Sequence, residues 1–331
     1  MSTAISNTAN SRRRPARRGR ASVTIAAARA AELADALGRE SVTANTRRSY
    51  KSAIDALRAW LAETEQSLTD ASLADYIATL DARGLAPASG RMVLAAVRFA
   101  SRKAGVECPV AERCREVMSG FARSAAGRGR GQAAALAWRT ADTAAAVASS
   151  DGPRGMRDAA IIAVMSDALL RSSELTELQV ADFAVDTDGA GRLTIRKSKT
   201  DVEGKGAVMF LGAPTVERVR AWLAVAGIAN GRLFRQVRKG GHVGDDGLST
   251  NAIARIVKSR VGSTGLDANR MSGHSARIGG AVELAAAGES LAAMQVAGRW
   301  SSPDMPGRYA RAELAARGAV ARRRYGINAA A

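Results

Sequence analysis

The sequence predicts a mostly α-helical protein of two domains, with one small antiparallel sheet in the second domain. Three observations predict this class. The chain has 331 residues, whereas a single compact domain usually contains about 100–200. Apolar residues recur at spacings of three and four over most of the chain, as they do on one face of a helix. Short β-rich runs separated by glycine-containing turns occur after residue 180.

Composition excludes several other classes. Hydrophobic residues make up 47% of the chain and charged residues 24%, which is typical of a globular protein and not of a wholly disordered or fibrous one. No apolar run approaches the roughly 18 residues that a membrane span needs, and no signal peptide is recognisable, so we expect a cytoplasmic protein without a membrane partner. Cys108 and Cys114 form no CxxC pair, and neither a disulfide framework nor a zinc site is expected.

The charge balance points to nucleic acid. The chain contains 49 basic and 31 acidic residues, a formal net charge of +18. When basic side chains neutralise the phosphates of a nucleic acid, the counterions condensed on the nucleic acid are released, and this release favours binding. Only seven of the basic residues are lysine, and GC-rich coding would explain arginine replacing lysine but not the excess of base over acid. Both halves of the chain are basic, which suits a clamp around DNA.

The N-terminal part divides into a tail and a helical domain. Residues 1–21 contain six arginines and no acid, and they lack apolar periodicity, so we expect a disordered basic tail. Residues 22–123 are predicted to form four or five short helices. Within them, apolar residues from Ile54 to Leu61 follow Thr43 or Thr46, either of which could cap a helix.

A linker and a mixed domain follow. Residues 124–136, which include SAAGRGRGQAAA, combine glycine, arginine and small residues, and they break the helical pattern. The second domain covers residues 137–331. Its predicted strands are 183–185, 193–195 and 207–211. Its predicted helices are 140–148, 157–170, 216–225, 250–261, 275–287, 291–296 and 312–323.

Four segments of the second domain carry a family resemblance: LLRSSELTEL (169–178), RKSKT (196–200), GHSARIGG (273–280) and GRWSSPDMPGRYAR (298–311). Together they resemble the tyrosine site-specific recombinases of the phage integrase family, and the resemblance extends over essentially the whole chain beyond the tail. Its specificity lies in residue order and spacing. The residues that carry it are Arg171, Lys199 28 positions later, His274, Arg277 three positions later, Trp300 23 positions later, and Tyr309 nine positions after that.

The resemblance implies a phosphodiester-cleaving site, and the residue types suit that chemistry. Attack on the phosphate builds negative charge on its non-bridging oxygens, which Arg171 and Arg277 would clamp with forked, permanently charged donors. The leaving 5′-oxygen needs a proton. Lys199, between two predicted strands, is the expected general acid, with Lys197 and Lys205 as its nearest rivals.

The remaining roles are implied in the same way. His274 would act as general base or phosphate ligand, and the indole N–H of Trp300 would donate to the same phosphate. Glu174 is expected to orient Arg171 rather than to react. Tyr309 would be the nucleophile, forming a 3′-phosphotyrosyl bond that keeps the energy of the broken DNA bond, so no cofactor, ATP or metal is expected. The other three tyrosines lack the family spacing.

Each of these residues has an ordinary structural interpretation when it is taken alone. An arginine can pair with a nearby glutamate, a hairpin lysine can be solvated, a histidine can cap a helix, and a tryptophan can belong to the core. Their joint order and spacing favours the catalytic interpretation.

The resemblance also implies an assembly. A helical core-binding domain and a mixed α/β catalytic domain would clamp double-stranded DNA of a bacterial nucleoid, plasmid or phage. A dimer would occupy one lox-like site with two inverted arms, and a tetramer would exchange strands between two sites through a Holliday junction. A C-terminal helix at about 312–323 would dock into a neighbouring subunit, or fold back in cis. Two alternatives are a type IB topoisomerase-like nicking and closing enzyme, and a catalytically silent DNA-binding protein on the same fold.

Candidate DNA-contacting residues follow from the implied DNA-facing helices and from basic clusters. Asn251 could bond adenine through its amide, or it could merely cap the helix or contact phosphate, and the two interpretations carry equal weight. The candidates are Arg47, Arg48, Arg91, Arg238, Lys239 and Asn251.

Overall fold

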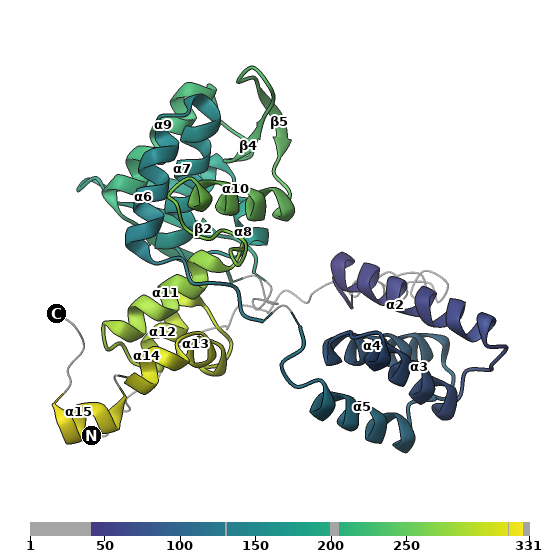
Figure 1. Ribbon diagram of the computed structural model, residues 1–331. Coiled ribbons are helices and arrows are strands. Elements are labelled where there is room, and N and C mark those ends of the chain that lie inside the picture. The colour runs from purple at the N-terminus through teal and green to yellow at the C-terminus, as the bar shows by residue number, and fades with distance from the viewer. Residues whose placement is uncertain (1–40, 130, 199–204, 317, 327–331) are drawn as a thin grey trace, which may run out of the picture. The chain divides into compact units, whose positions relative to one another are not determined.

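The computed structural model describes residues 41–129, 131–198, 205–316 and 318–326 (Figure 1). Two compact units divide between Gly129 and Arg130. The predicted basic tail, residues 22–40 and Lys199 lie outside the described residues. The predicted fold class is confirmed, since the units are mostly helical and the strands form small antiparallel sheets.

The described part of the first unit is a helical domain. Its core is centred on Leu57, Leu73 and Phe121, each almost completely buried. Of the two candidate caps at its first described helix, Thr43 is the N-cap, because its hydroxyl accepts the Thr46 amide at 3.2 Å. The helices are α2 (Ala44–Glu63), α3 (Asp70–Ala82), α4 (Pro87–Ala104) and α5 (Glu112–Ser124).

A buried thiol marks the junction of α3 and α5. The carboxylate of Asp70 accepts the backbone amides of Ala111, Arg113 and Cys114 at 2.8, 3.0 and 3.2 Å, and so satisfies the start of α5. Burial, together with the Asp70 carboxylate, raises the pKa of Cys114 to about 12. The thiol therefore stays protonated at neutral pH, in keeping with an inert role.

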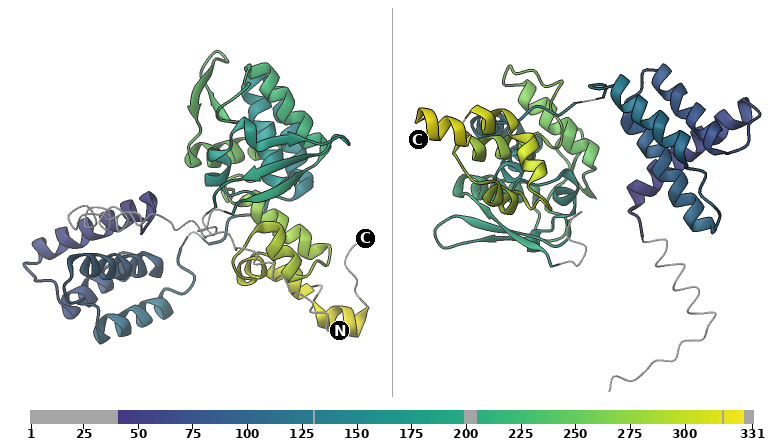
Figure 2. Two further views of the ribbon diagram at one scale, coloured as in Figure 1. Left: turned by 180° about the vertical axis from the view of Figure 1, so that it is seen from behind. Right: turned by 90° about the horizontal axis from the view of Figure 1, so that it is seen from below.

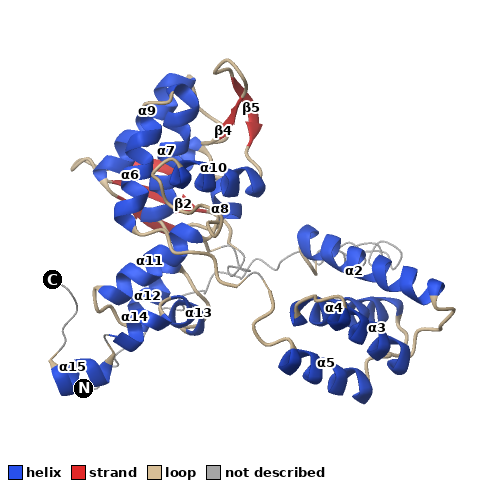
Figure 3. Ribbon diagram, in the orientation of Figure 1, coloured by secondary structure: helices blue, strands red, loops and turns tan. Residues whose placement is uncertain are grey.

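The second unit combines helices with two small antiparallel sheets in its described residues, drawn red in Figure 3. In the three-stranded sheet, Leu193 pairs with Phe183 on one side and Met209 on the other. The strands are β1 (Phe183–Val185), β2 (Gly191–Ile195), β3 (Ala207–Leu211), β4 (Arg235–Val237) and β5 (Val243–Gly247). The helices are α6 (Trp138–Ser149), α7 (Gly152–Asp167), α8 (Ser172–Glu177), the 3₁₀ turn η1 (Val180–Asp182), α9 (Ala213–Ala226), α10 (Thr250–Gly262), α11 (Ser275–Ala286), α12 (Leu291–Gly298), α13 (Asp304–Tyr309), α14 (Arg311–Ala316) and α15 (Ala319–Tyr325).

Helix α7 is the centre of this unit. It is buried without interruption from Arg157 to Ser166 and packs against α6, α9 and β3, as the views in Figure 2 allow the reader to follow. A smaller apolar cluster joins the end of α7 to α11, α12 and the C-terminal helices, with Trp300 among its buried members. The backbone amides of Ala134 and Leu136, in the predicted linker, donate to carbonyls of the second unit, and Leu136 is buried in its core.

The structure corrects several predicted elements. The helix predicted at 157–170 spans Gly152–Asp167 instead, because Leu169 adopts a left-handed backbone conformation with φ +47°. The helix predicted at 312–323 is two helices, α14 and α15, with the poor helix former Gly318 between them. The hairpin β4–β5 is a second sheet that the sequence did not predict. Within the described part of the chain, no helix is both long enough and apolar enough to span a bilayer.

Candidate active site

The turn that follows α7 positions the arginines of the site. The chain leaves the helix at Ala168, turns at Leu169 and reaches Arg171, which is the N-cap residue of α8. The carbonyls of Ala168 and Leu169 are then not bonded along a continuing helix, and each accepts an arginine side chain, Arg299 at 3.1 Å and Arg277 at 2.6 Å. A helix C-terminus favours cations, so this turn is suited to gather guanidinium groups.

Glu174 holds two of the arginines. Its carboxylate accepts Arg171 Nη1 at 2.6 Å, the Arg171 backbone amide at 3.0 Å and Arg299 Nη2 at 2.7 Å. The side chain is only 2% exposed. Burial by itself raises the pKa of Glu174, but the Arg171 amide and the charges of Arg299 and Arg171 outweigh it, so the pKa lies below its ordinary value. Glu174 is therefore ionised at neutral pH and bonds both the side chain and the backbone amide of Arg171.

Arg277 is buried beside this network. It is 2% exposed, and its guanidinium carbon lies 4.3 Å from the centre of the Trp300 ring. Within the described residues its buried Nη2 has no hydrogen-bond partner. Burial, and then the charges of Arg171 and Arg299, lower the pKa of Arg277 to about 9. A buried donor left unpaired is unfavourable, and an anion bonded to it would relieve both the unpaired donor and the mutual repulsion.

Trp300 connects Arg277 to Tyr309. The two aromatic rings lie 6.2 Å apart, tilted by 58°. Gly298 permits this position of the indole, because a Cβ there would overlap the ring. Tyr309 ends α13 and is half-buried, and its backbone carbonyl accepts Gln132 Nε2 at 3.4 Å.

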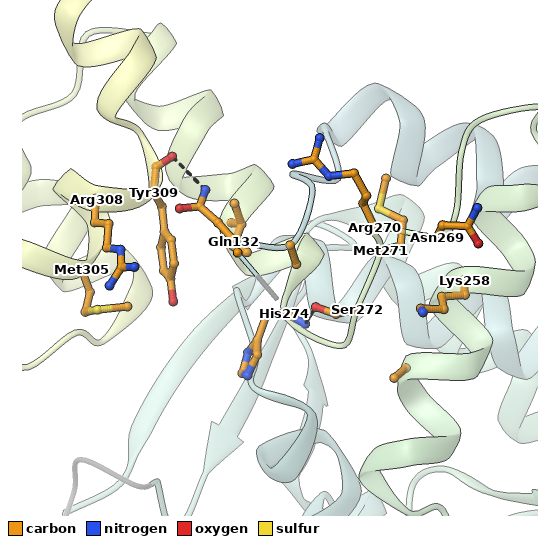
Figure 4. Close-up of a pocket in the computed structure, with 14 residues that line it drawn as sticks. Gln132, Lys258, Asn269, Arg270, Met271, Ser272, His274, Met305, Arg308 and Tyr309 are labelled. Carbon is orange, nitrogen blue, oxygen red and sulfur yellow. Dashed lines mark hydrogen bonds between the residues drawn. The ribbon is translucent and has the colours of Figure 1, made fainter. Parts of the chain in front are cut away.

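His274 and Tyr309 line a common pocket of about 670 Å³. Figure 4 shows the two side chains coming from different segments, His274 from the start of α11 and Tyr309 from the C-terminal helices. His274 is exposed, and its backbone amide donates to the Ser272 hydroxyl at 3.1 Å. One turn further along α11, Arg277 points into the buried network. The basic residues Lys258, Arg270 and Arg308 also line the pocket.

The structure places five of the seven residues predicted for the site in two sets of contacts. Arg171 is ion-paired with Glu174, and Trp300 packs against both Arg277 and Tyr309. Arg299, which is ion-paired with Glu174 and directly precedes Trp300, links the two sets. His274 joins them through the pocket that it shares with Tyr309. Lys199 lies outside the described residues. Strands β2 and β3, which flank it in sequence, pair at Ile195 and Ala207. Lys197 and Glu174 line one pocket of about 370 Å³. The chain that follows β2 therefore passes beside Glu174 at Lys197.

Arg299 is the residue that the sequence analysis missed. It precedes Trp300, and its side chain is 12% exposed and ion-paired with Glu174. The sequence offered one weak signal, an arginine directly before the tryptophan of the motif. Nothing local could indicate its partner, which lies 125 residues earlier.

All six candidate DNA-contacting residues are exposed in the described part of the chain. Two lie on α2, one on α4, two at the β4–β5 turn and one on α10: Arg47 and Arg48, Arg91, Arg238 and Lys239, and Asn251. The N-cap of α10 is Ser249, whose hydroxyl accepts the Ala252 amide at 3.2 Å. Asn251 is therefore not the capping residue. A contact with a base and a contact with a phosphate are the two interpretations that remain. Arg255 and Lys258 follow it at helical spacing and are also exposed.

The chain belongs to the phage integrase family. Residues 140–315 match the family itself, and residues 33–100 match the N-terminal SAM-like domain of phage integrases. It is thus a tyrosine recombinase, an enzyme of DNA recombination and integration that binds, cleaves and rejoins DNA.

Individual relatives agree with this class. The recombinase Cre of Escherichia phage P1 is 28% identical over 254 residues, which cover 72% of this chain and 74% of Cre. A lambda integrase dimer bound to a core site superposes with a TM-score of 0.58 at 17% identity, covering 85% of this chain and 93% of that one. XerH recombinase bound to a palindromic difH substrate, in a post-cleavage complex, gives a TM-score of 0.58 at 16% identity, covering 75% and 70%. At these identities the two structures support the fold.

Proposed function

We propose that this chain is a site-specific recombinase that cleaves DNA with Tyr309 and joins two sites through a Holliday junction. The single observation that carries this proposal is the buried network in which Arg171 and Arg277 converge beside Trp300 and Tyr309. Such a concentration of positive charge in a largely buried site favours the binding of an anion. A DNA phosphodiester bound there would lie next to the phenol of Tyr309.

The two arginines would bind the scissile phosphate. Arg277 would use its unpaired Nη2 on one non-bridging oxygen, while Arg171, fixed by Glu174, would bond another. Both bonds strengthen as charge develops in the pentavalent transition state. The indole N–H of Trp300 would add a neutral donor to the same phosphate.

Tyr309 would then attack phosphorus in line with the 5′-oxygen. The bond from the phenolic oxygen to phosphorus forms as the bond from phosphorus to the 5′-oxygen breaks, which leaves a 3′-phosphotyrosyl ester and a free 5′-hydroxyl. The phenolic proton would pass to His274 or to solvent, and Lys199 would protonate the 5′-oxygen. Attack by a 5′-hydroxyl of the partner strand reverses the step and rejoins the DNA. No oxidation or net hydrolysis takes place, so the reaction consumes no ATP.

Recognition would involve both units. The exposed basic residues of α2, α4 and the β4–β5 turn suit phosphate contacts, and the exposed face of α10 from Asn251 suits the major groove. The palindromic substrate of XerH and the lambda integrase dimer on its core site support a dimer on two inverted arms. We extend this arrangement to a tetramer that pairs two lox-like sites on chromosomal, plasmid or phage DNA.

Two linked experiments test the proposal. The first selects bound duplexes from a random library and offers the selected site, nicked next to the scissile phosphate, as a substrate that traps the covalent intermediate. The second offers two intact copies on separate supercoiled plasmids and looks both for exchanged flanks and for relaxation of the supercoils. We expect both an adduct and exchanged products. An adduct with relaxation of supercoils but no exchange would support the topoisomerase alternative, and binding without any adduct would support the silent DNA-binding protein.

A further inference from the structure

The backbone at Arg299 is unusual for its residue type. It follows α12 with φ +53° and ψ +47°, in the left-handed region that glycine normally occupies at a helix end. An arginine in this conformation carries a conformational free energy that its side chain must offset. The side-chain contacts of Arg299 are therefore what stabilises this conformation.

Those contacts connect two segments that carry site residues. Arg299 Nη2 donates to Glu174 Oε2 at 2.7 Å, and Nη1 donates to the Ala168 carbonyl at 3.1 Å. Ala168 belongs to the turn that follows α7, and Glu174 belongs to α8, whose N-cap residue is Arg171. The next residue after Arg299 is Trp300, whose ring packs on Arg277. One side chain thus links the Arg171 turn to the Trp300 turn.

We propose that Arg299 is a positioning residue for DNA cleavage, which holds Glu174 so that the carboxylate can orient Arg171 and which holds Trp300 against Arg277. The inference rests on the proposed function, because it concerns the same reaction. The two outer nitrogens of Arg299 are taken by Glu174 and Ala168, and its remaining donor, Nε, is buried without a hydrogen-bond partner among the described residues. It acts through its neighbours.

The geometry of Glu174 explains why one partner would not suffice. Arg171 bonds Oε1 with its guanidinium and Oε2 with its backbone amide, so without Arg299 both bonds to the carboxylate would come from the same residue that the carboxylate has to orient. Arg299 adds a charged donor to Oε2 and fixes the plane of the carboxylate.

The test measures single-turnover formation of the covalent adduct on the nicked duplex selected by the wild-type protein, together with the dissociation constant for that duplex and the melting temperature. The first variant is Arg299→Gly, which removes the side chain and suits the left-handed backbone. We expect the cleavage rate to fall roughly 10–100-fold, as misplacement of a catalytic group by about 1 Å does, with DNA affinity and melting temperature close to those of the wild type. Arg192→Ala, which removes one exposed arginine from β2, is the matched control for lost charge and should cleave normally.

A double variant separates positioning from independent action. If Arg299 acts through Glu174, then Arg299→Gly should slow a Glu174→Gln protein little further, whereas multiplied effects would overturn the proposal. Arg299→Lys keeps the charge but cannot bond both acceptors in the same fork, and we expect an intermediate rate; a full wild-type rate in a normally folded Arg299→Lys protein would also overturn it. A lowered melting temperature with unchanged cleavage would assign Arg299 a purely structural role. Absence of an adduct with the wild-type protein would instead contradict the proposed function, and the positioning role with it.

Discussion

The candidate active site places three arginines around one carboxylate. Glu174 neutralises one positive charge and is shared by Arg171 and Arg299, while Arg277 lies behind them with an unpaired donor among the described residues. A buried cluster with this charge imbalance is unfavourable without an anion. Its instability in the free protein is therefore part of its affinity for a phosphate.

The pH dependence of stability should report the state of Glu174. Its pKa in the folded protein lies below the ordinary value of 4.5, so the stabilisation is present above that value and is lost as the pH falls through the folded pKa. We expect the free energy of unfolding to decrease more steeply below about pH 4.5 for the wild type than for Glu174→Gln. Urea titrations at a series of pH values measure this. Glu177→Gln, at a largely exposed carboxylate, is the control, and parallel curves for wild type and Glu174→Gln would contradict the prediction.

Replacement of the nucleophile should separate binding from chemistry. Tyr309→Phe removes the attacking oxygen and leaves the ring that packs near Trp300, so we expect unchanged affinity for the selected site and no covalent adduct. Tyr325→Phe changes an exposed tyrosine of α15 and should react normally. Denaturing gels of the nicked substrate detect the adduct. An adduct that survives the first change and disappears with the second would place the nucleophile at Tyr325.

The proton donor can be tested through the leaving group. Lys199→Ala should slow cleavage of a normal phosphodiester far more than cleavage of a 5′-bridging phosphorothioate, because a thiolate leaves without needing a proton. Lys197→Ala and Lys205→Ala should show no such selective rescue. Single-turnover rates on the two substrates decide the matter, and equal slowing of both by Lys199→Ala would remove this lysine from the acid role.

The sequence could indicate site residues that belong to the spaced family motifs. It could not indicate residues whose role depends on a contact far away in the chain. The order and spacing of the family pattern singled out Arg277, Trp300 and Tyr309, whose side chains lie next to one another in the structure. Their catalytic roles stay predictions. Arg299 was not predictable, because one arginine among many has no local sign of a partner 125 residues away. The α10 cap could not be chosen either, since Ser249 and Asn251 both favour helix starts and only the backbone shows which one accepts the amide.

Helices with strong apolar periodicity were predicted within a few residues, and the exceptions have physical causes. The strand Val243–Gly247 contains two glycines and two aspartates, which are rare in strands, so its pairing with β4 depends on tertiary context rather than on propensity. Helix α7 ends at Asp167 because Leu169 adopts a left-handed backbone conformation, and this turn leaves the Leu169 carbonyl available to accept Arg277 Nη1.

Helix α10 carries the prediction about base choice. Asn251 is exposed near its N-terminus, and an amide can bond adenine N6 and N7 together, whereas arginine suits guanine O6 and N7. We expect A·T at the base pair that Asn251 faces, and a shift toward G·C for Asn251→Arg, with a discrimination of roughly 1–3 kcal/mol. Binding selections with both proteins measure it. An unchanged preference at every position of the arm, with a uniform change in affinity, would leave Asn251 as a phosphate contact.

Helix α15, near the C-terminus, offers a candidate contact surface for assembly. Helix α15 exposes 71% of Val320 and 65% of Tyr325, and apolar side chains at a chain end are suited to a contact with another surface. The family resemblance implies a neighbouring subunit as that surface. Folding back onto the same chain is the other possibility, and the two make opposite predictions.

Truncation after Ala316 distinguishes them. If α15 docks into a neighbouring subunit, the truncated protein should melt normally and bind a single selected arm with unchanged affinity, but it should assemble tetramers on paired sites at least about tenfold more weakly. Burial of a side chain such as Val320 contributes roughly 1.5–3 kcal/mol, which corresponds to a factor of ten or more in association. Sedimentation velocity on one-arm and two-site DNA measures both steps, and Val320→Asp provides a point change with the full-length chain. A lower melting temperature of the isolated truncated protein, with unchanged tetramer formation, would mean that α15 folds back in cis.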